Sequence, residues 1–245
     1  MTDSRHSDQI HFCTTQWTLV MGAAASSVSV RQAALEKLCG RYWLPLYAFL
    51  RRRGQAEHEA EDLVQGFFAQ LLEKDYLNAI DASKGRFRSF MLVALQHFAA
   101  NERAKAKTVK RGGAVTTLPI DFSIGERWYR HEPTDGMTAE MLFERRWALS
   151  LLDNVMQRLK QRLSEQNRVE LFEILKPHLV RDAQKLPYAE IAQRLECSVA
   201  SIKSTMHRMK GWYRELLLDE ISQTVAQQDV ADELRRLMAI VSEKS

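Results

Sequence analysis

The sequence predicts an all-α protein, built as two small helical domains joined by a linker. Apolar residues recur at spacings of three and four along most of the chain, and no β-rich alternation appears. The chain has 245 residues, and because domains usually run to about 100 to 200 residues, two compact units are favoured. The helical periodicity fades after two adjacent glycines, at 112 and 113, which places the linker there.

Four segments follow from this pattern. We expect a first domain over residues 1–112, a linker over 113–138, a second domain over 139–218 and a C-terminal helical extension over 219–245. Paired apolar residues from Leu63 to Leu72 predict a helix from Glu57 to Lys74. Pro45 predicts a break or kink in the helix before it, and Pro177 predicts the end of a short helix in the second domain.

Composition excludes several classes of protein. Hydrophobic residues make up 45% of the chain and charged residues 27%, which fits neither a disordered nor a membrane protein. No window approaches the roughly 18 apolar residues of a membrane span, and no apolar stretch follows a basic start, so we expect no membrane span, no secretory signal and a cytoplasmic location. Cys13, Cys39 and Cys197 show no C-x-x-C spacing, so we expect reduced, structural thiols.

The second domain carries a helix-turn-helix pattern. Residues 187–195 predict a short helix, residues 196–199 a turn, and a second helix begins near Ala200. A buried stripe is expected along this second helix at Ile202, Met206, Met209, Tyr213 and Leu216. The opposite face carries Ser201, Lys203, Ser204, His207, Arg208 and Lys210, and no acidic residue lies between Cys197 and Arg214.

Short polar side chains at the start of a helix, followed by cations, suit reading of base edges and phosphates in the major groove. An ordinary helical hairpin with a solvated basic face is the alternative. Two residues depart from the usual pattern. Glu196 stands where such turns often have glycine, and Gly211 lies inside the second helix at a cost of about 1 kcal/mol.

A basic and aromatic segment ends the first domain. Between Lys84 and Arg111 there are eight cations against the single acid Glu102. Phe87, Phe90 and Phe98 are interleaved with them. Cations beside aromatic rings are the ingredients of a single-strand nucleic-acid site, yet the helical spacing of these phenylalanines favours a place in the core for each of them.

These motifs together resemble one known family. The residues that carry the likeness are 59–65, 87–90, 187–192, 198–204 and the pair His207 and Arg208, in matching order and separation. They are similar to the extracytoplasmic-function (ECF) type of RNA polymerase sigma factor over approximately Thr14 to Leu218. Residues 143–149 resemble a branch found in bacteria rich in such factors, whereas residues 219–245 extend past the family's minimal pattern.

The resemblance implies a sigma region 2-like bundle that binds core RNA polymerase and the minus-ten promoter element. It implies a sigma region 4-like helix-turn-helix that binds the minus-thirty-five element. The partners it implies are the bacterial RNA polymerase core and promoter DNA. A regulatory protein, such as an anti-sigma factor, is a further kind of partner found with this family. It implies no cofactor and no enzymatic activity.

Functional residues are carried over by position. Core polymerase binding falls on Glu61, Asp62 and Gln65. The minus-ten element falls on Arg86, Arg88, Asn101, Arg103, Lys105 and Lys107. The minus-thirty-five element falls on Ser198, Ser201, Lys203, Ser204, His207 and Arg208. For the extension, whose apolar residues from Val230 to Val241 predict a helix, two roles are open: packing on the second domain and regulating it.

Two other functions compete with this interpretation. A stand-alone helix-turn-helix transcriptional regulator explains the second domain but leaves the basic segment of the first without a role. An enzyme would use Glu57, His58, Glu61 and Asp62 to hold a metal ion, because His58 and Asp62 are one helical turn apart. No second histidine is placed to complete that site, and acids at a helix start are favoured anyway. We therefore expect no metal and no enzyme.

Overall fold

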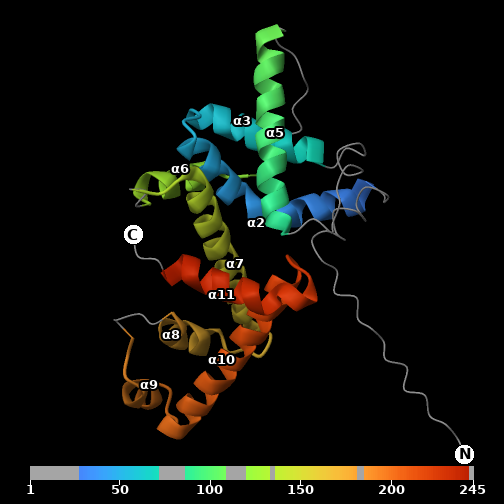
Figure 1. Cartoon of the computed structure of the whole chain (residues 1–245). Coiled ribbons are helices and arrows are strands. Elements are labelled where there is room, and N and C mark those ends of the chain that lie inside the picture. The colour runs from blue at the N-terminus through green and yellow to red at the C-terminus, as the bar shows by residue number, and fades with distance from the viewer. Residues whose placement is uncertain (1–27, 72–85, 109–119, 133–135, 181–184, 243–245) are drawn as a thin grey trace, which may run out of the picture.

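The structure is a computed structural model that describes residues 28–71, 86–108, 120–132, 136–180 and 185–242 (Figure 1). Every regular element in these ranges is helical and none is a strand. The all-α prediction is confirmed. No described helix is both long enough and apolar enough to cross a lipid bilayer. The helices are α2 (Val28–Arg52), α3 (Glu57–Leu71), α5 (Phe87–Thr108), α6 (Phe122–His131), α7 (Ala139–Ser164), α8 (Val169–Leu179), α9 (Tyr188–Arg194), α10 (Val199–Ser222), the 3-10 helix η2 (Gln227–Asp229) and α11 (Val230–Ser242).

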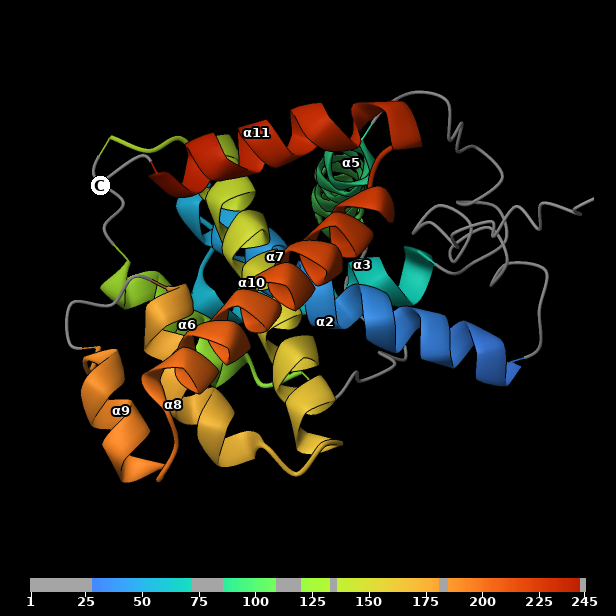
Figure 2. The ribbon, with the colours of Figure 1, turned by 90° about the horizontal axis from the view of Figure 1, so that it is seen from below.

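The helices group around α7, which runs through the middle of the molecule (Figure 1). Its N-terminal half packs against α2, and α2 also contacts α3 and α6. Its C-terminal half lies with α8, α9 and α10 at the other end. Figure 2 shows α11 crossing the molecule beside α7 and the near end of α5. The chain therefore closes on itself, with its last helix against its middle.

Buried residues form two hydrophobic clusters. The larger one takes residues from α2, α3, α5, α6, the first part of α7, the end of α10 and α11. The smaller one is the core of the helix-turn-helix unit and contains Leu159, Leu163, Phe172, Leu175, Ile191, Ala192, Ile202, Met206 and Met209. Both α7 and α10 contribute to both clusters, so the change from one core to the other falls inside these helices. The arrangement of two domains joined by a linker stays a prediction.

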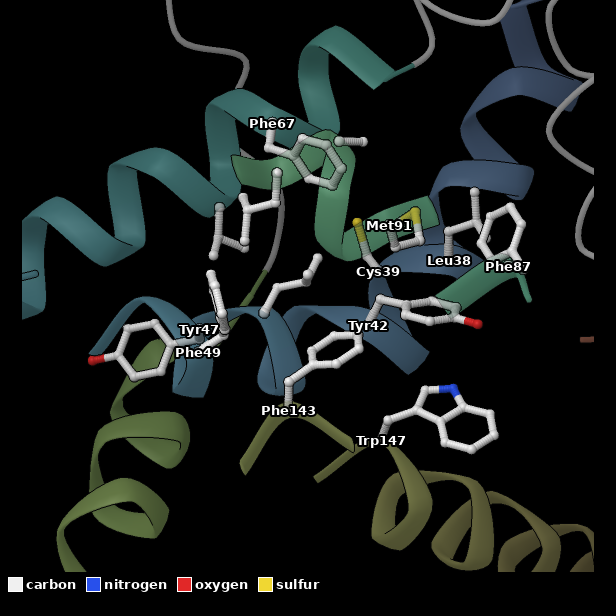
Figure 3. Close-up of a cluster of buried hydrophobic side chains, with 14 of the residues drawn as sticks. Leu38, Cys39, Tyr42, Tyr47, Phe49, Phe67, Phe87, Met91, Phe143 and Trp147 are labelled. Atoms are coloured by element: carbon white, nitrogen blue, oxygen red, sulfur yellow. The ribbon is translucent and has the colours of Figure 1, made fainter. Parts of the chain in front are cut away.

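The larger core explains the aromatic residues of the basic segment. Figure 3 shows Phe143 and Trp147 of α7 pointing toward Tyr42 of α2, with Phe87 and Met91 of α5 on its other side. The rings of Tyr42 and Phe87 meet edge to face with their centroids 5.5 Å apart. Phe98 is also buried and Phe90 is half-buried against the same core. These phenylalanines pack inward, which is the alternative that their spacing favoured.

The segment interpreted as a linker contains a helix. α6 packs on α2, and Gly125 lies at the contact, where a Cβ atom would come within 2.8 Å of a ring carbon of Trp43. The sequence signal was weak because α6 has only ten residues and a glycine in its second turn. The close approach of the two helices requires this glycine, so it marks a contact rather than a break.

A buried carboxylate anchors α6 to α2. The Tyr47 hydroxyl donates a hydrogen bond of 2.6 Å to Glu126 Oε2, and Arg51 Nε donates one of 2.9 Å to the same oxygen. Arg130 Nε donates to the other oxygen at 2.7 Å. Burial opposes the ionisation of Glu126, but the hydrogen bonds from Arg51, Tyr47 and Arg130 outweigh it and lower the pKa of the carboxyl to about 2.

Three other local predictions are corrected or completed. Pro45 lies inside α2, which continues through it, and Pro177 lies inside α8 rather than ending it. Cys39 is buried, and burial together with the nearby Glu36 raises the pKa of its thiol to about 12, as suits an inert structural residue. Cys197 is exposed in the turn before α10 and has no such structural burial. Cys13 lies outside the described residues.

Candidate nucleic-acid interface

The turn between α9 and α10 adopts a Schellman ending. Glu196 has a φ of 48°, in the left-handed region that favours glycine. The Cys197 amide donates to the Ala192 carbonyl at 2.9 Å, and the Glu196 amide donates to the Gln193 carbonyl at 3.3 Å. The departure noted at Glu196 therefore falls on the one residue of the turn that carries the backbone strain. The turn keeps its shape without the usual glycine, at a cost of about 1 kcal/mol.

A serine caps the start of α10. The Ser198 side chain accepts a hydrogen bond of 3.1 Å from the Ser201 amide. This hydrogen bond fixes the first turn of α10. The side-chain oxygen of Ser198, a residue predicted to contact DNA, therefore has a structural role as well. Ser198 stays exposed.

The first three turns of α10 separate two faces. Ile202, Met206 and Met209 are buried in the smaller core, as their spacing predicted. The polar and basic residues on the other face are all exposed: Ser201, Lys203, Ser204, His207, Arg208 and Lys210. Arg208 has a contact with its own helix, where Nη2 donates to Thr205 Oγ1 at 3.4 Å. The result is a continuous exposed surface, which we call the α10 basic face.

The predicted core-binding residues gather on one side of α3. Ala60, Val64, Phe67, Phe68 and Leu71 of this helix are buried. Asp62 is exposed, while Glu61 and Gln65 are half-buried beside it. Partial burial and the neighbouring acids Glu57 and Asp62 raise the pKa of Glu61. The three predicted residues thus form an acidic patch one to two helical turns from the start of α3.

The C-terminal half of α5 projects away from the body of the molecule (Figure 1). Asn101, Arg103 and Lys105 are exposed there, and Lys105 Nζ lies 2.8 Å from Glu102 Oε1. Lys107 belongs to the same helix, but its side chain lies outside what the structure describes. Four of the six predicted minus-ten residues therefore share one helical arm, at the opposite end of Figure 1 from the start of α10.

Arg88, one of the predicted minus-ten residues, is buried. Its side chain is 0% exposed and cannot contact DNA in this conformation. Arg88 Nε lies 2.9 Å from Glu144 Oε2 on α7, and Nη1 is paired with Glu233 on α11. The guanidinium also lies over the ring of Trp147, with Cζ 4.3 Å from the centroid. Burial lowers the pKa of Arg88, and Glu144 opposes that change by attraction.

Arg86 is covered in part by Glu233. Arg86 Nε lies 2.8 Å from Glu233 Oε2, and about a third of the Arg86 side chain remains exposed, 36%. The predicted minus-ten set is therefore divided between the exposed arm and a covered pair at the start of α5.

One acid of the enzyme interpretation is paired with a cation. Glu57 Oε2 lies 3.1 Å from Arg130 Nη2. Within the described ranges, no three His, Cys, Asp or Glu side chains are grouped so that they would hold a metal ion.

These features define an all-helical protein with a helix-turn-helix unit and two separated basic surfaces. We compared the chain with protein-family models, with curated proteins and with solved structures, and no match was found in any of the three comparisons.

Sequence reasoning missed Glu233 and Glu144 as partners of the basic segment. A signal for the burial of Arg88 was present, because Arg88, Met91 and Leu95 lie three and four residues apart, on one side of α5. Met91 and Leu95 are both buried, so the helix turns Arg88 toward the core. The partner acid, 145 residues away, had no local signal.

Proposed function

We propose that this protein is an ECF-type sigma factor, which binds core RNA polymerase and directs it to promoter DNA. The observation that carries the proposal is the α10 basic face. Six polar or basic side chains are exposed there, on a helix whose other side is locked into the core and whose first turn is capped. This is the arrangement that major-groove recognition requires. The resemblance of motifs in both halves of the chain links that surface to a polymerase partner.

The roles divide along α10. Lys203 and Ser204 lie in its first two turns, where a helix placed in the major groove approaches base edges. Arg208 and Lys210 lie further along and are suited to phosphates. The acidic patch on α3 supplies the partner surface, because exposed acids give charge complementarity at little cost to folding. The arm of α5 supplies the cations Arg103 and Lys105, and the amide of Asn101, for an opened strand.

Run-off transcription tests the proposal. Bacterial core polymerase, with and without this protein, is offered a library of promoter fragments. We expect transcripts from a subset of fragments only when the protein is present. Asp62→Asn should reduce that transcription by weakening the complex with core polymerase. The matched control is Glu165→Gln, which changes an exposed acid at the other end of the molecule.

The stand-alone regulator gives a different result in the same experiment. It predicts sequence-specific duplex binding through α10, no complex with core polymerase and no protein-dependent transcripts. That outcome would overturn the sigma proposal while leaving the role of the α10 basic face in place.

A further inference from the structure

The C-terminal extension covers the start of α5. The Phe87 amide donates a hydrogen bond of 3.3 Å to the Thr224 carbonyl, in the turn that follows α10. Glu233 on α11 is paired with both Arg86 and Arg88. Figures 1 and 2 both place α11 beside this end of α5. Two of these contacts thus hold cations that the resemblance assigns to DNA, and the third holds the backbone of Phe87 between them.

Two of the charged side chains at this contact are almost completely removed from solvent. Glu233 is 1% exposed and Arg88 is 0% exposed. Arg88 Nη2 is buried without a hydrogen-bond partner, and Glu144 is shared with Arg236, whose Nη2 lies 3.5 Å away. Removing charges from water opposes their attraction, so a buried ion pair of this kind contributes little net stability relative to an apolar contact. Stability alone therefore does not explain why arginines occupy these two positions of α5.

The apolar attachment of α11 is narrow. Glu233 and Leu237 are its buried residues. Val230, Leu234, Ile240 and Val241 are half-buried against the larger core. We expect a terminal helix with one fully buried apolar residue, Leu237, to open at a lower free energy than the whole fold.

We propose that α11 is an internal cover on a single-strand binding site, with Glu233 in the place of a DNA phosphate. A carboxylate and a phosphate both bind arginine through charge-assisted hydrogen bonds, so a DNA backbone competes with Glu233 for Arg86 and Arg88. Single-stranded DNA binding at the start of α5 then requires α11 to leave. This inference rests on the proposed function, in that it takes the start of α5 as a DNA contact.

The cover acts on one surface only. The α10 basic face is exposed while α11 is docked. Loosening α11 is therefore expected to raise affinity for single-stranded DNA and to leave duplex binding by α10 unchanged. This difference separates release of a cover from a general gain of positive charge, which would raise both affinities.

Two pairs of neighbouring residues on α11 provide the test in the full-length chain. Glu233→Gln removes the covering charge, and Asp232→Asn makes the same chemical change at an exposed acid that pairs with Arg235. Leu237→Ala weakens the docking of α11 without altering charge, and Met238→Ala is its exposed control. Circular dichroism checks that each variant keeps its helices.

The readout is fluorescence anisotropy with a labelled single-stranded oligonucleotide and, separately, a labelled duplex. Glu233→Gln and Leu237→Ala should each bind the single strand about tenfold more tightly than the parent, because a protein whose competent state is rare binds in proportion to its population. Asp232→Asn and Met238→Ala should match the parent. Hydrogen exchange in α11 should accelerate when the single strand is added to the parent.

The cover is overturned if the buried-site variants gain no more than their controls, or if none of the four binds the single strand. Its failure is distinct from failure of the proposed function. Parent protein that supports promoter-specific transcription, with Glu233→Gln unchanged in single-strand affinity, would remove the cover alone. A gain in Glu233→Gln without any transcription from core polymerase would remove the sigma proposal alone.

Discussion

The starts of α5 and α10 are both basic, yet the cations of α5 are buried or partly covered and those of α10 are exposed. Lys203 and Arg208 stand in solvent on a helix whose apolar side faces the smaller core. Arg88 stands among apolar residues of α5, beneath α11 and over Trp147. The position of each residue around its helix decides the difference, because Lys203 lies away from Ile202 and Met206 whereas Arg88 lies in line with Met91 and Leu95. Local charge therefore indicates the sign of a surface, and helical phase indicates whether that charge is accessible.

The largest expected difference between the two regions is in stability. Arg88→Ala should lower the free energy of unfolding by about 3 to 5 kcal/mol, because it leaves Glu233 and Glu144 without their buried partner. Lys203→Ala, at an exposed residue, should change it by about 0.5 kcal/mol or less. Urea unfolding followed by circular dichroism measures both. Similar values for the two variants would contradict the contrast.

Acid provides a second way to separate buried from exposed charge. The pKa of Glu126 is lowered from 4.5 to about 2 in the fold, so its ionised carboxyl stabilises the protein above pH 4.5. This contribution, up to about 3 kcal/mol, is lost as the pH falls from 4.5 toward 2. The stability difference between the parent and Glu126→Gln should therefore be constant from pH 6 to 8 and shrink as the pH falls toward 2. Asp232→Asn should show little difference at any of these pH values, and an undiminished Glu126 difference at pH 2 would refute the assignment.

The α10 basic face should itself divide into two kinds of contact. Lys203→Ala should relax the preference for particular bases, with a loss of discrimination of about 1 to 3 kcal/mol if its contact is with guanine. Arg208→Ala should weaken all duplex sequences alike and reduce the salt slope by about one. A panel of mutated sites, measured at several salt concentrations, distinguishes the two. Uniform losses from both substitutions would remove the division between reader and anchor.

The smallest effect concerns Gly211. A Cβ atom added there would meet nothing within 4 Å, so Gly211→Ala should stabilise the protein by about 0.5 to 1 kcal/mol. Gly125→Ala should do the opposite, since its Cβ would lie 2.8 Å from a ring carbon of Trp43. Thermal unfolding of both variants measures the pair. Destabilisation by Gly211→Ala would mean that the outer side of α10 is not open at this point.

Sequence periodicity predicted those parts of the molecule whose contacts are local. The buried residues Ile202, Met206 and Met209 follow a regular spacing over several turns, and so do the apolar residues of α3. The turn at Glu196 was recognisable from the short segment around it. These predictions succeeded because the helix period carries them and no distant partner is needed to fix them.

The remainder depends on contacts between distant residues. α6 is short and contains Gly125. A glycine is needed there because the ring of Trp43 lies against it, and Trp43 is 82 positions earlier in the sequence. The extension was predicted as a helix, but nothing local indicated that Glu233 would meet Arg88. The exposed residues of the candidate site, on α3, the arm of α5 and α10, were therefore predicted from the sequence, and the contacts of the covered residues depend on the fold.

One consequence of α7 concerns cooperativity. Its 26 residues form a rod about 39 Å long. Buried side chains of its N-terminal part belong to the larger core, and those of its C-terminal end belong to the smaller core. Melting either core removes support from the same helix, so neither core loses its packing without a free-energy penalty to the other. Calorimetry should accordingly record one main transition rather than two. Substitutions in the core of the helix-turn-helix unit should then shift the unfolding temperature of α2 and α3, which they never touch.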